Sequence, residues 1–123
     1  MKTRHWFLLN TVIMASFSVG LIATPDRILD LYGMSSGDDM TRLMLRWFGT
    51  AVIGIAAMSW FARNLEAGPG RLAIVKGLIV TWTAMLVISF VTVFTGAANS
   101  LGWSNVIIDS ALIVGFSTRL RDD

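Results

Sequence analysis

The segment LAIVKGLIVTWTAMLVISFVTVFT, residues 72–95, decides the fold of this chain, because only one of its 24 side chains is charged. The hydrocarbon core of a bilayer is about 30 Å thick and is spanned by a helix of about 20 mostly apolar residues. A helix is required there, since lipid offers the backbone amides no partner and the segment is far too long for a barrel strand. We therefore predict that residues 72–95 form a transmembrane helix.

Three further apolar segments have the length of a membrane span. They cover residues 7–24, 43–62 and 103–120, and the last is the weakest because it is short and contains polar side chains. Short linkers leave such spans little choice but to pack as antiparallel neighbours. We predict an all-α fold, an integral membrane four-helix up-down antiparallel bundle, as a single domain over the whole chain of 123 residues.

The composition agrees with a membrane protein. Apolar residues make up 54% of the chain and charged residues only 15%, whereas a soluble domain of this size carries about a quarter. The chain has no cysteine and a single histidine, His5. This excludes a disulfide scaffold, thiolate-bound metals and multi-histidine sites, so we predict no metal and no cofactor.

The distribution of Lys and Arg predicts the orientation of the spans. Seven of the ten basic residues lie near the chain ends and the turn between the second and third spans: Lys2, Arg4, Arg63, Arg71, Lys76, Arg119 and Arg121. Cytoplasmic flanks of membrane helices are enriched in these residues. We therefore predict a multi-pass protein of the bacterial inner (cytoplasmic) membrane with both termini cytoplasmic. Because the charges are spread over three flanks, we predict no nucleic-acid partner.

The basic start of the chain followed by an apolar run is also typical of a signal peptide, and Ser18-Val19-Gly20 resembles a cleavage site. We interpret residues 7–24 as a retained helix. After it, Thr24-Pro25-Asp26 is a helix-start pattern, and Gly33 ends the segment. The sequence thus predicts a short amphipathic helix between spans one and two, on the outer membrane surface.

Ionisable side chains inside the predicted spans are candidate site residues. Each costs about 2.5–3.5 kcal/mol at the centre of an inserted helix and needs an escape or a partner. Lys76 lies one turn from the cytoplasmic end, so its long stem can carry the ammonium to the interface; a contact with Asn10 is the alternative. Trp82 lies midway along its span, and its indole N–H needs a partner inside the bundle. Arg42 is a further candidate, four residues before Arg46 on the same helix face.

Asp109 has a short stem and lies roughly 9 Å inside the outer end of its span, at about 1.5 Å per residue. Arg46 descends from the same outer face, and a guanidinium can bind a carboxylate with two parallel hydrogen bonds. We predict a buried interhelical ion pair between Arg46 and Asp109. It would act as a structural lock, as a ligand or headgroup site, or in proton coupling, and the absence of any contact is the remaining alternative.

Several short motifs resemble one family over nearly the whole chain. They are Pro25, Leu31-Tyr32-Gly33, Arg46-x-x-Gly49, Trp60-x-Ala62-Arg63, Leu101-Gly102-Trp103 and Gly115-Phe116. The pattern is similar to small uncharacterised bacterial four-helix integral membrane proteins of the DoxX-like type. The resemblance implies an integral bundle that is an accessory of a redox or envelope system. Arg46 matches an arginine typical of the second helix in that pattern, whereas Asp109 has no counterpart.

The sequence contains no catalytic motif, so we predict that the protein is not an enzyme. Its predicted function is that of a non-catalytic accessory or assembly subunit packing against partner helices, either its own copies in a homo-oligomer or a larger membrane complex, with membrane lipid around it. The alternative is a membrane binder or carrier of a lipid, quinone or similar small apolar ligand in a cavity near Arg46 and Asp109. A binder should show an internal cavity below Trp47 and Trp103, with Arg46 pointing into it.

Overall fold

The computed structural model describes residues 1–122, and these form helices and no strand. Three helices are long and apolar enough to cross a membrane, which supports the predicted membrane location: α1 (Thr3–Ala23), α3 (Asp39–Ala62) and α4 (Pro69–Phe94). The other elements are shorter: α2 (Pro25–Leu31), α5 (Gly102–Ser117) and the 3-10 helix η1 (Thr118–Arg121). The predicted short helix between the first two spans is therefore present as α2.

Local capping chemistry sets the ends of the long helices. The carboxylate of Asp38 accepts a hydrogen bond from the Thr41 amide at 2.8 Å, so α3 begins before the apolar run that predicts it. Helix α4 begins at Pro69, directly after Gly68, where a proline loses no intrahelical hydrogen bond. Both helices consequently begin a few residues before the starts predicted from hydropathy alone.

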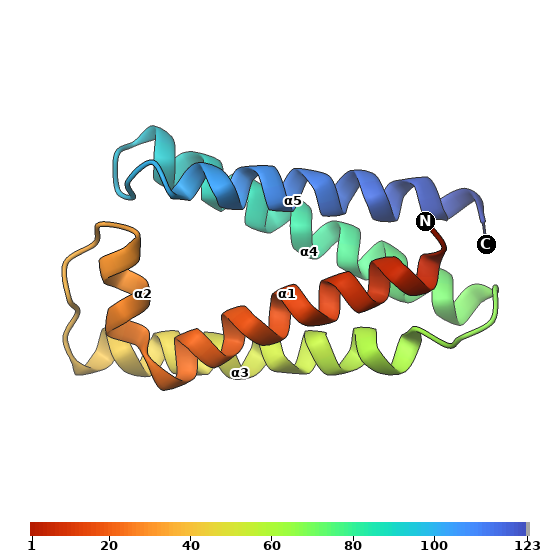
Figure 1. Cartoon of the computed structure of the whole chain (residues 1–123), viewed down its shortest axis with the longest axis horizontal. Helices are drawn as coiled ribbons and strands as arrows, with labels where there is room; N and C mark the ends of the chain where they lie inside the picture. The colour runs from red at the N-terminus through yellow and green to blue at the C-terminus, as the bar shows by residue number, and fades with distance from the viewer. Residues whose placement is uncertain (123) are drawn as a thin grey trace.

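The long helices form two hairpins rather than one evenly packed group (Figure 1). Helix α1 packs along α3 to make the first hairpin, and α4 packs along α5 to make the second. Contacts between the hairpins are sparse, and the main ones join α1 to α5 and α3 to α4. Successive long helices reverse direction, which leaves both chain termini at the same end of the molecule (Figure 1).

The first hairpin is held by a very close approach of two backbones. The hydroxyl of Ser18 donates a 2.6 Å hydrogen bond to the carbonyl oxygen of Gly49. A Cβ at Gly49 would lie 2.8 Å from Ile22 Cγ1 and 3.2 Å from the Ser18 carbonyl oxygen. Only glycine fits this position, and small residues are what allow membrane helices to approach so closely.

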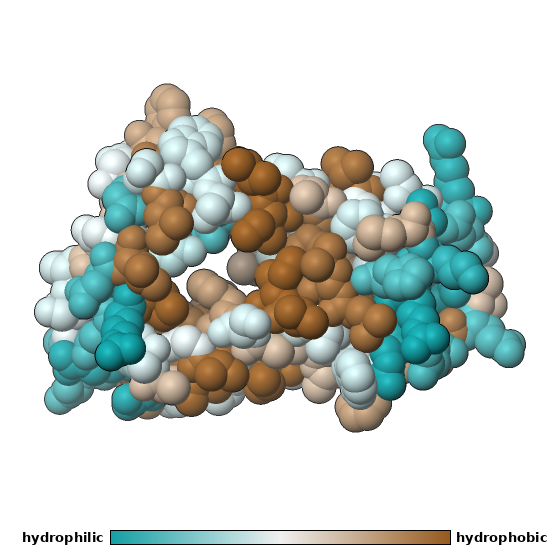
Figure 2. All heavy atoms as spheres, viewed as in Figure 1, coloured by the Kyte–Doolittle hydropathy of each residue, from teal (hydrophilic) through white to brown (hydrophobic). Residues whose placement is uncertain are grey.

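The hydrophobic core lies in the half of the molecule near the chain termini, which we call the closed half. Its buried residues come from α1, α3, α4 and α5: Phe7, Met14, Val52, Ala56, Ala62, Val75, Leu78, Trp82, Leu112 and Phe116. The other half, which we call the open half, contains α2 and the ends of the hairpins that it joins. Figure 2 shows an apolar band between two hydrophilic ends, with a hollow in the open half.

Candidate functional site

The predicted ion pair between Arg46 and Asp109 does not form, and that prediction is wrong. Arg46 is exposed, and its Nε donates a 3.2 Å hydrogen bond to the carbonyl oxygen of Ile22. The last carbonyls of α1 have no partner within their own helix, so they attract a cation from the neighbouring helix. Asp109 belongs to the second hairpin and Arg46 to the first, so the two side chains lie on helices that do not pack together.

Asp109 is instead held within the second hairpin. Only 2% of the residue is exposed, and its Oδ2 accepts a 2.9 Å hydrogen bond from the hydroxyl of Ser89 on α4. Among the described residues, no basic side chain forms an ion pair with it. The sequence predicted a guanidinium as the partner of Asp109, but the partner is the hydroxyl of Ser89. The short turn between α4 and α5 places these two side chains opposite each other.

The other candidates each have a definite place. Arg42 pairs with Asp26 of α2 at 3.1 Å and with Asp39 at 2.9 Å, so it ties α2 to the start of α3. Lys76 is exposed, as its predicted escape to the interface requires, and it does not bond to Asn10.

Trp82 has the internal partner that its position requires. Its indole N–H donates a 2.7 Å hydrogen bond to Asn10 Oδ1. The side-chain amide of Asn10 in turn donates a 2.7 Å hydrogen bond to the hydroxyl of Ser59 on α3. All three residues are buried, so the chain of hydrogen bonds joins α4, α1 and α3 through the closed half. We assign these residues a structural role, since every member is satisfied within the protein.

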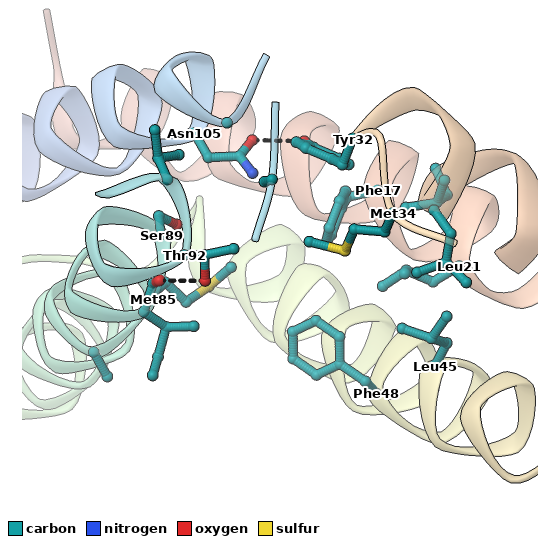
Figure 3. Close-up of a pocket in the computed structure, with 17 residues that line it drawn as sticks. Phe17, Leu21, Tyr32, Met34, Leu45, Phe48, Met85, Ser89, Thr92 and Asn105 are labelled. Atoms are coloured by element: carbon teal, nitrogen blue, oxygen red, sulfur yellow. Dashed lines mark hydrogen bonds between the residues drawn. The ribbon is translucent and has the colours of Figure 1, made fainter. Parts of the chain in front are cut away.

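The open half contains a cavity of about 420 Å³ between the two hairpins (Figure 3). The first hairpin and α2 contribute one wall: Phe17, Leu21, Ile28, Leu29, Tyr32, Met34, Leu45 and Phe48. The second hairpin and the loop between its helices contribute the other: Ala84, Met85, Ile88, Ser89, Thr92, Val93, Ala98, Gly102 and Asn105. Arg46 does not line it, and no charged residue does among those described.

A few polar groups lie on one side of this apolar cavity. The hydroxyl of Tyr32 donates a 2.8 Å hydrogen bond to Asn105 Oδ1, and the amide nitrogen of Asn105 turns toward the interior (Figure 3). Thr92 donates its hydroxyl hydrogen to Ile88 O in its own helix. Ser89 donates to Asp109. The cavity therefore offers an amide donor and hydroxyl oxygens that can accept, in otherwise apolar surroundings.

Helix α2 closes the end of the cavity that lies farthest from the termini. It runs across the long helices from the first hairpin to the second (Figure 1). Beyond its last turn, Asn99 of the α4–α5 loop donates its backbone N–H to Tyr32 O at 2.8 Å and its side-chain amide to Leu31 O at 2.9 Å. Gly33, with a φ of 69°, makes the turn that allows this contact. We call this set of hydrogen bonds the α2 clamp.

Sequence reasoning missed most residues of the cavity. The usable signal was weak: Ser89 and Thr92 lie three residues apart on one face of α4, while Asn105 and Asp109 lie four apart on α5. Apolar wall residues such as Phe48 carry no signal, because nothing in their sequence separates them from residues that face lipid.

Comparison of the chain with protein-family models, with curated proteins and with solved structures finds no match. The resemblance to DoxX-like proteins therefore remains a prediction from the residues that carry it.

Proposed function

We propose that this protein is a four-span membrane protein that binds a neutral, lipid-soluble molecule in the cavity between its two hairpins. The observation that carries the proposal is the cavity of about 420 Å³, whose size is within the range of small-molecule sites. Its walls are largely apolar, and its few polar groups converge on one side, which is the usual arrangement for fixing the orientation of an apolar ligand.

The proposed topology uses α5 and η1 together as the fourth span. They comprise 16 and 4 residues, and at about 1.5 Å per residue they reach roughly 30 Å. With both termini at one end and seven basic residues there, the positive-inside rule favours cytoplasmic termini. The bacterial inner membrane is the proposed location, in line with the DoxX-like resemblance.

The lining of the cavity indicates the class of ligand. A charged molecule would find no counter-charge among the described lining residues, and burying an unpaired charge is costly. A neutral amphiphile fits better, because its carbonyl oxygen can accept from the Asn105 amide while its hydrocarbon part contacts Phe48 and Ile88. A quinone or a neutral glyceride has this chemistry. The hollow opens through the apolar band, so such a ligand would enter from lipid (Figure 2).

The predicted accessory-subunit function is less well supported. An accessory subunit is expected to have one extended apolar face for its partner. The helices instead carry exposed apolar side chains at many positions, for example Val80, Val87 and Ile107. Lipid requires such a surface as much as a partner protein does, so the surface favours neither function. The cavity favours a binder.

Native mass spectrometry of the full chain in a mild detergent tests this proposal. The purified protein is incubated with decylubiquinone or with 1-oleoylglycerol, and bound adducts are counted. The decisive variant is Ala84→Phe, which places a ring in the cavity, and the matched control is Ala73→Phe, an exposed position on the same helix that does not line it.

The wild-type protein and Ala73→Phe should retain one neutral amphiphile per chain, and Ala84→Phe should lose it. Equal adduct levels in both Phe variants would refute the cavity as the binding site. A wild-type chain that stays without an adduct but carries stoichiometric further protein chains would favour the accessory function.

A further inference from the structure

The end of the molecule that holds both termini contains a second, very different cavity, which we call the basic cup. Its volume is about 710 Å³. It is lined by the start of α1, the end of α3, the start of α4 and the C-terminal segment: Met1, Lys2, Thr3, Arg4, His5, Phe7, Arg63, Arg71, Arg119 and Asp122. Figure 2 shows the hydrophilic surface at this end of the apolar band.

Among the described residues that line the cup, cations outnumber carboxylates. Five Lys and Arg residues line it, against one carboxylate among the described residues, that of Asp122. Arg119 is the cation that Asp122 pairs with, at 2.8 Å. The guanidinium of Arg63 lies 3.5 Å above the centre of the Trp60 ring, which holds it in place without neutralising it. Lys2 and Arg4 form no ion pair with any described residue.

Several cations gathered around one hollow repel one another, so the arrangement is stabilised when an anion enters. Guanidinium and ammonium groups both bind phosphate, the first with two parallel hydrogen bonds and the second as a point charge. We propose that the basic cup binds a phosphate group, with Lys2 and Arg4 as its principal ligands and Arg63 as a fixed third cation.

Two sources could supply that phosphate. The cup lies at the edge of the apolar band, where the headgroups of an anionic lipid would lie, and basic pockets on the cytoplasmic side of membrane helices bind such headgroups. A free phosphorylated metabolite of the cytoplasm carries the same group. This inference does not depend on the neutral ligand proposed for the cavity in the open half, because the two sites share no lining residue.

A titration of the full chain in neutral detergent tests the proposal. Dioleoylphosphatidylglycerol is the anionic lipid probe, dioleoylphosphatidylcholine is the lipid control without net charge, and glycerol 3-phosphate is the soluble probe. The test variant is Lys2→Gln/Arg4→Gln. The control is Arg27→Gln/Lys76→Gln, which removes the same two residue types from positions outside the cup.

The wild-type protein and the control variant should bind phosphatidylglycerol much more tightly than phosphatidylcholine. The Lys2→Gln/Arg4→Gln variant should bind phosphatidylglycerol about thirtyfold more weakly, because each cation near an anionic headgroup contributes about 1 kcal/mol and 1.4 kcal/mol is a factor of ten. Tighter binding of glycerol 3-phosphate than of phosphatidylglycerol would assign the site to a soluble phosphate, and the reverse order would assign it to the lipid.

Both side chains are exposed, so the test variant should unfold at the same temperature as the wild type, which a melting curve checks. A wild-type protein that binds neither phosphatidylglycerol nor glycerol 3-phosphate more tightly than phosphatidylcholine would overturn the proposal. An equal loss in the test and control variants would also overturn it, since net charge rather than the cup would then explain the binding.

Discussion

The closed and open halves of this molecule are built from the same four helices, α1, α3, α4 and α5, but they differ in how the space between the hairpins is filled. In the closed half, large side chains fill the space between the hairpins, and the buried polar groups of Asn10, Ser59 and Trp82 satisfy one another. In the open half the hairpins stay apart, and the space between them is a cavity. The comparison indicates that packing in the closed half stabilises the fold, so the space in the open half can stay unfilled by side chains.

The largest expected effect comes from truncating one phenylalanine in each half and comparing the free energies of unfolding. Phe116 is fully buried, with ring centroids 5.8 Å from Phe7 and 6.3 Å from Trp6, whereas Phe48 is 44% exposed on the cavity wall. Phe116→Ala should lower the free energy of unfolding by about 3–5 kcal/mol, because it leaves a cavity in a packed core. Phe48→Ala should cost about 1 kcal/mol or less.

Denaturation of both variants in detergent, followed by circular dichroism, measures the difference. Similar losses of stability would mean that the two halves contribute equally to the fold and that the distinction drawn here fails.

Two helical glycines allow the contrast between packed and open surroundings to be tested by adding one methyl group to each. A Cβ at Gly115 would lie 2.2 Å from an atom of the Trp6 ring, while a Cβ at Gly54 would meet nothing within 4 Å. Gly115→Ala should destabilise the protein by about 1–3 kcal/mol, since the Trp6 ring must move away from α5. Gly54→Ala should stabilise it by up to about 1 kcal/mol through helix propensity. Melting temperatures that shift in the same direction would contradict this prediction.

The α2 clamp offers a smaller effect that is confined to the open half. Asn99→Ala removes the side-chain hydrogen bond to Leu31 O and the one that Asn99 Oδ1 accepts from the Leu101 N–H, and each loss should cost about 0.5–1.5 kcal/mol. The chain has no cysteine, so spin labels can be attached uniquely at Asp30→Cys and Ser100→Cys on the two sides of the clamp. Electron paramagnetic resonance should show a broader distance distribution in Asn99→Ala and an unchanged one in Asn64→Ala, at the opposite end.

The smallest expected effect concerns the start of α3. The Thr41 amide and then the Thr41 hydroxyl donate to the Asp38 carboxylate and hold its pKa below the ordinary value of 3.8. A carboxyl group with a lowered pKa in the folded state contributes stability above the unfolded pKa, and this contribution disappears as the pH falls through the folded value. Wild-type α3 should therefore fray slightly from about pH 4 downward.

Carboxyl carbon shifts in a nuclear magnetic resonance titration measure the Asp38 pKa directly. Asp38→Asn keeps the cap but cannot titrate, so its first turn should show no such pH dependence. An Asp38 shift that titrates at or above 3.8 would contradict the assignment.

Hydropathy predicted the helical elements well because their apolar runs are set by local composition. The segment of residues 72–95 and the helix start at Thr24-Pro25-Asp26 both appear in the structure close to where the sequence places them. The requirement that Trp82 find an internal partner also follows from chemistry alone. These features depend on one residue and its immediate neighbours.

The pairing of Arg46 with Asp109 failed because it depends on which helices are neighbours. The depth of a residue in the membrane can be counted along its span from the sequence. The direction in which each helix face points, and the helix that it packs against, are instead set by contacts such as that of Ser18 with Gly49. The cavity was missed for the same reason, since it is a space left by the divergence of two hairpins. A span pattern predicts which residues are in lipid and not which of them face each other.

The crosswise position of α2 has a consequence for how any occupant of the open half would exchange. This helix and the α2 clamp close the end of the cavity away from the termini, and the closed half fills the opposite end. The remaining route therefore leads sideways through the apolar band, which the proposed bilayer would surround. The occupancy of the cavity would then follow the mole fraction of the ligand among the membrane lipids, and dilution of the surrounding water would leave it unchanged.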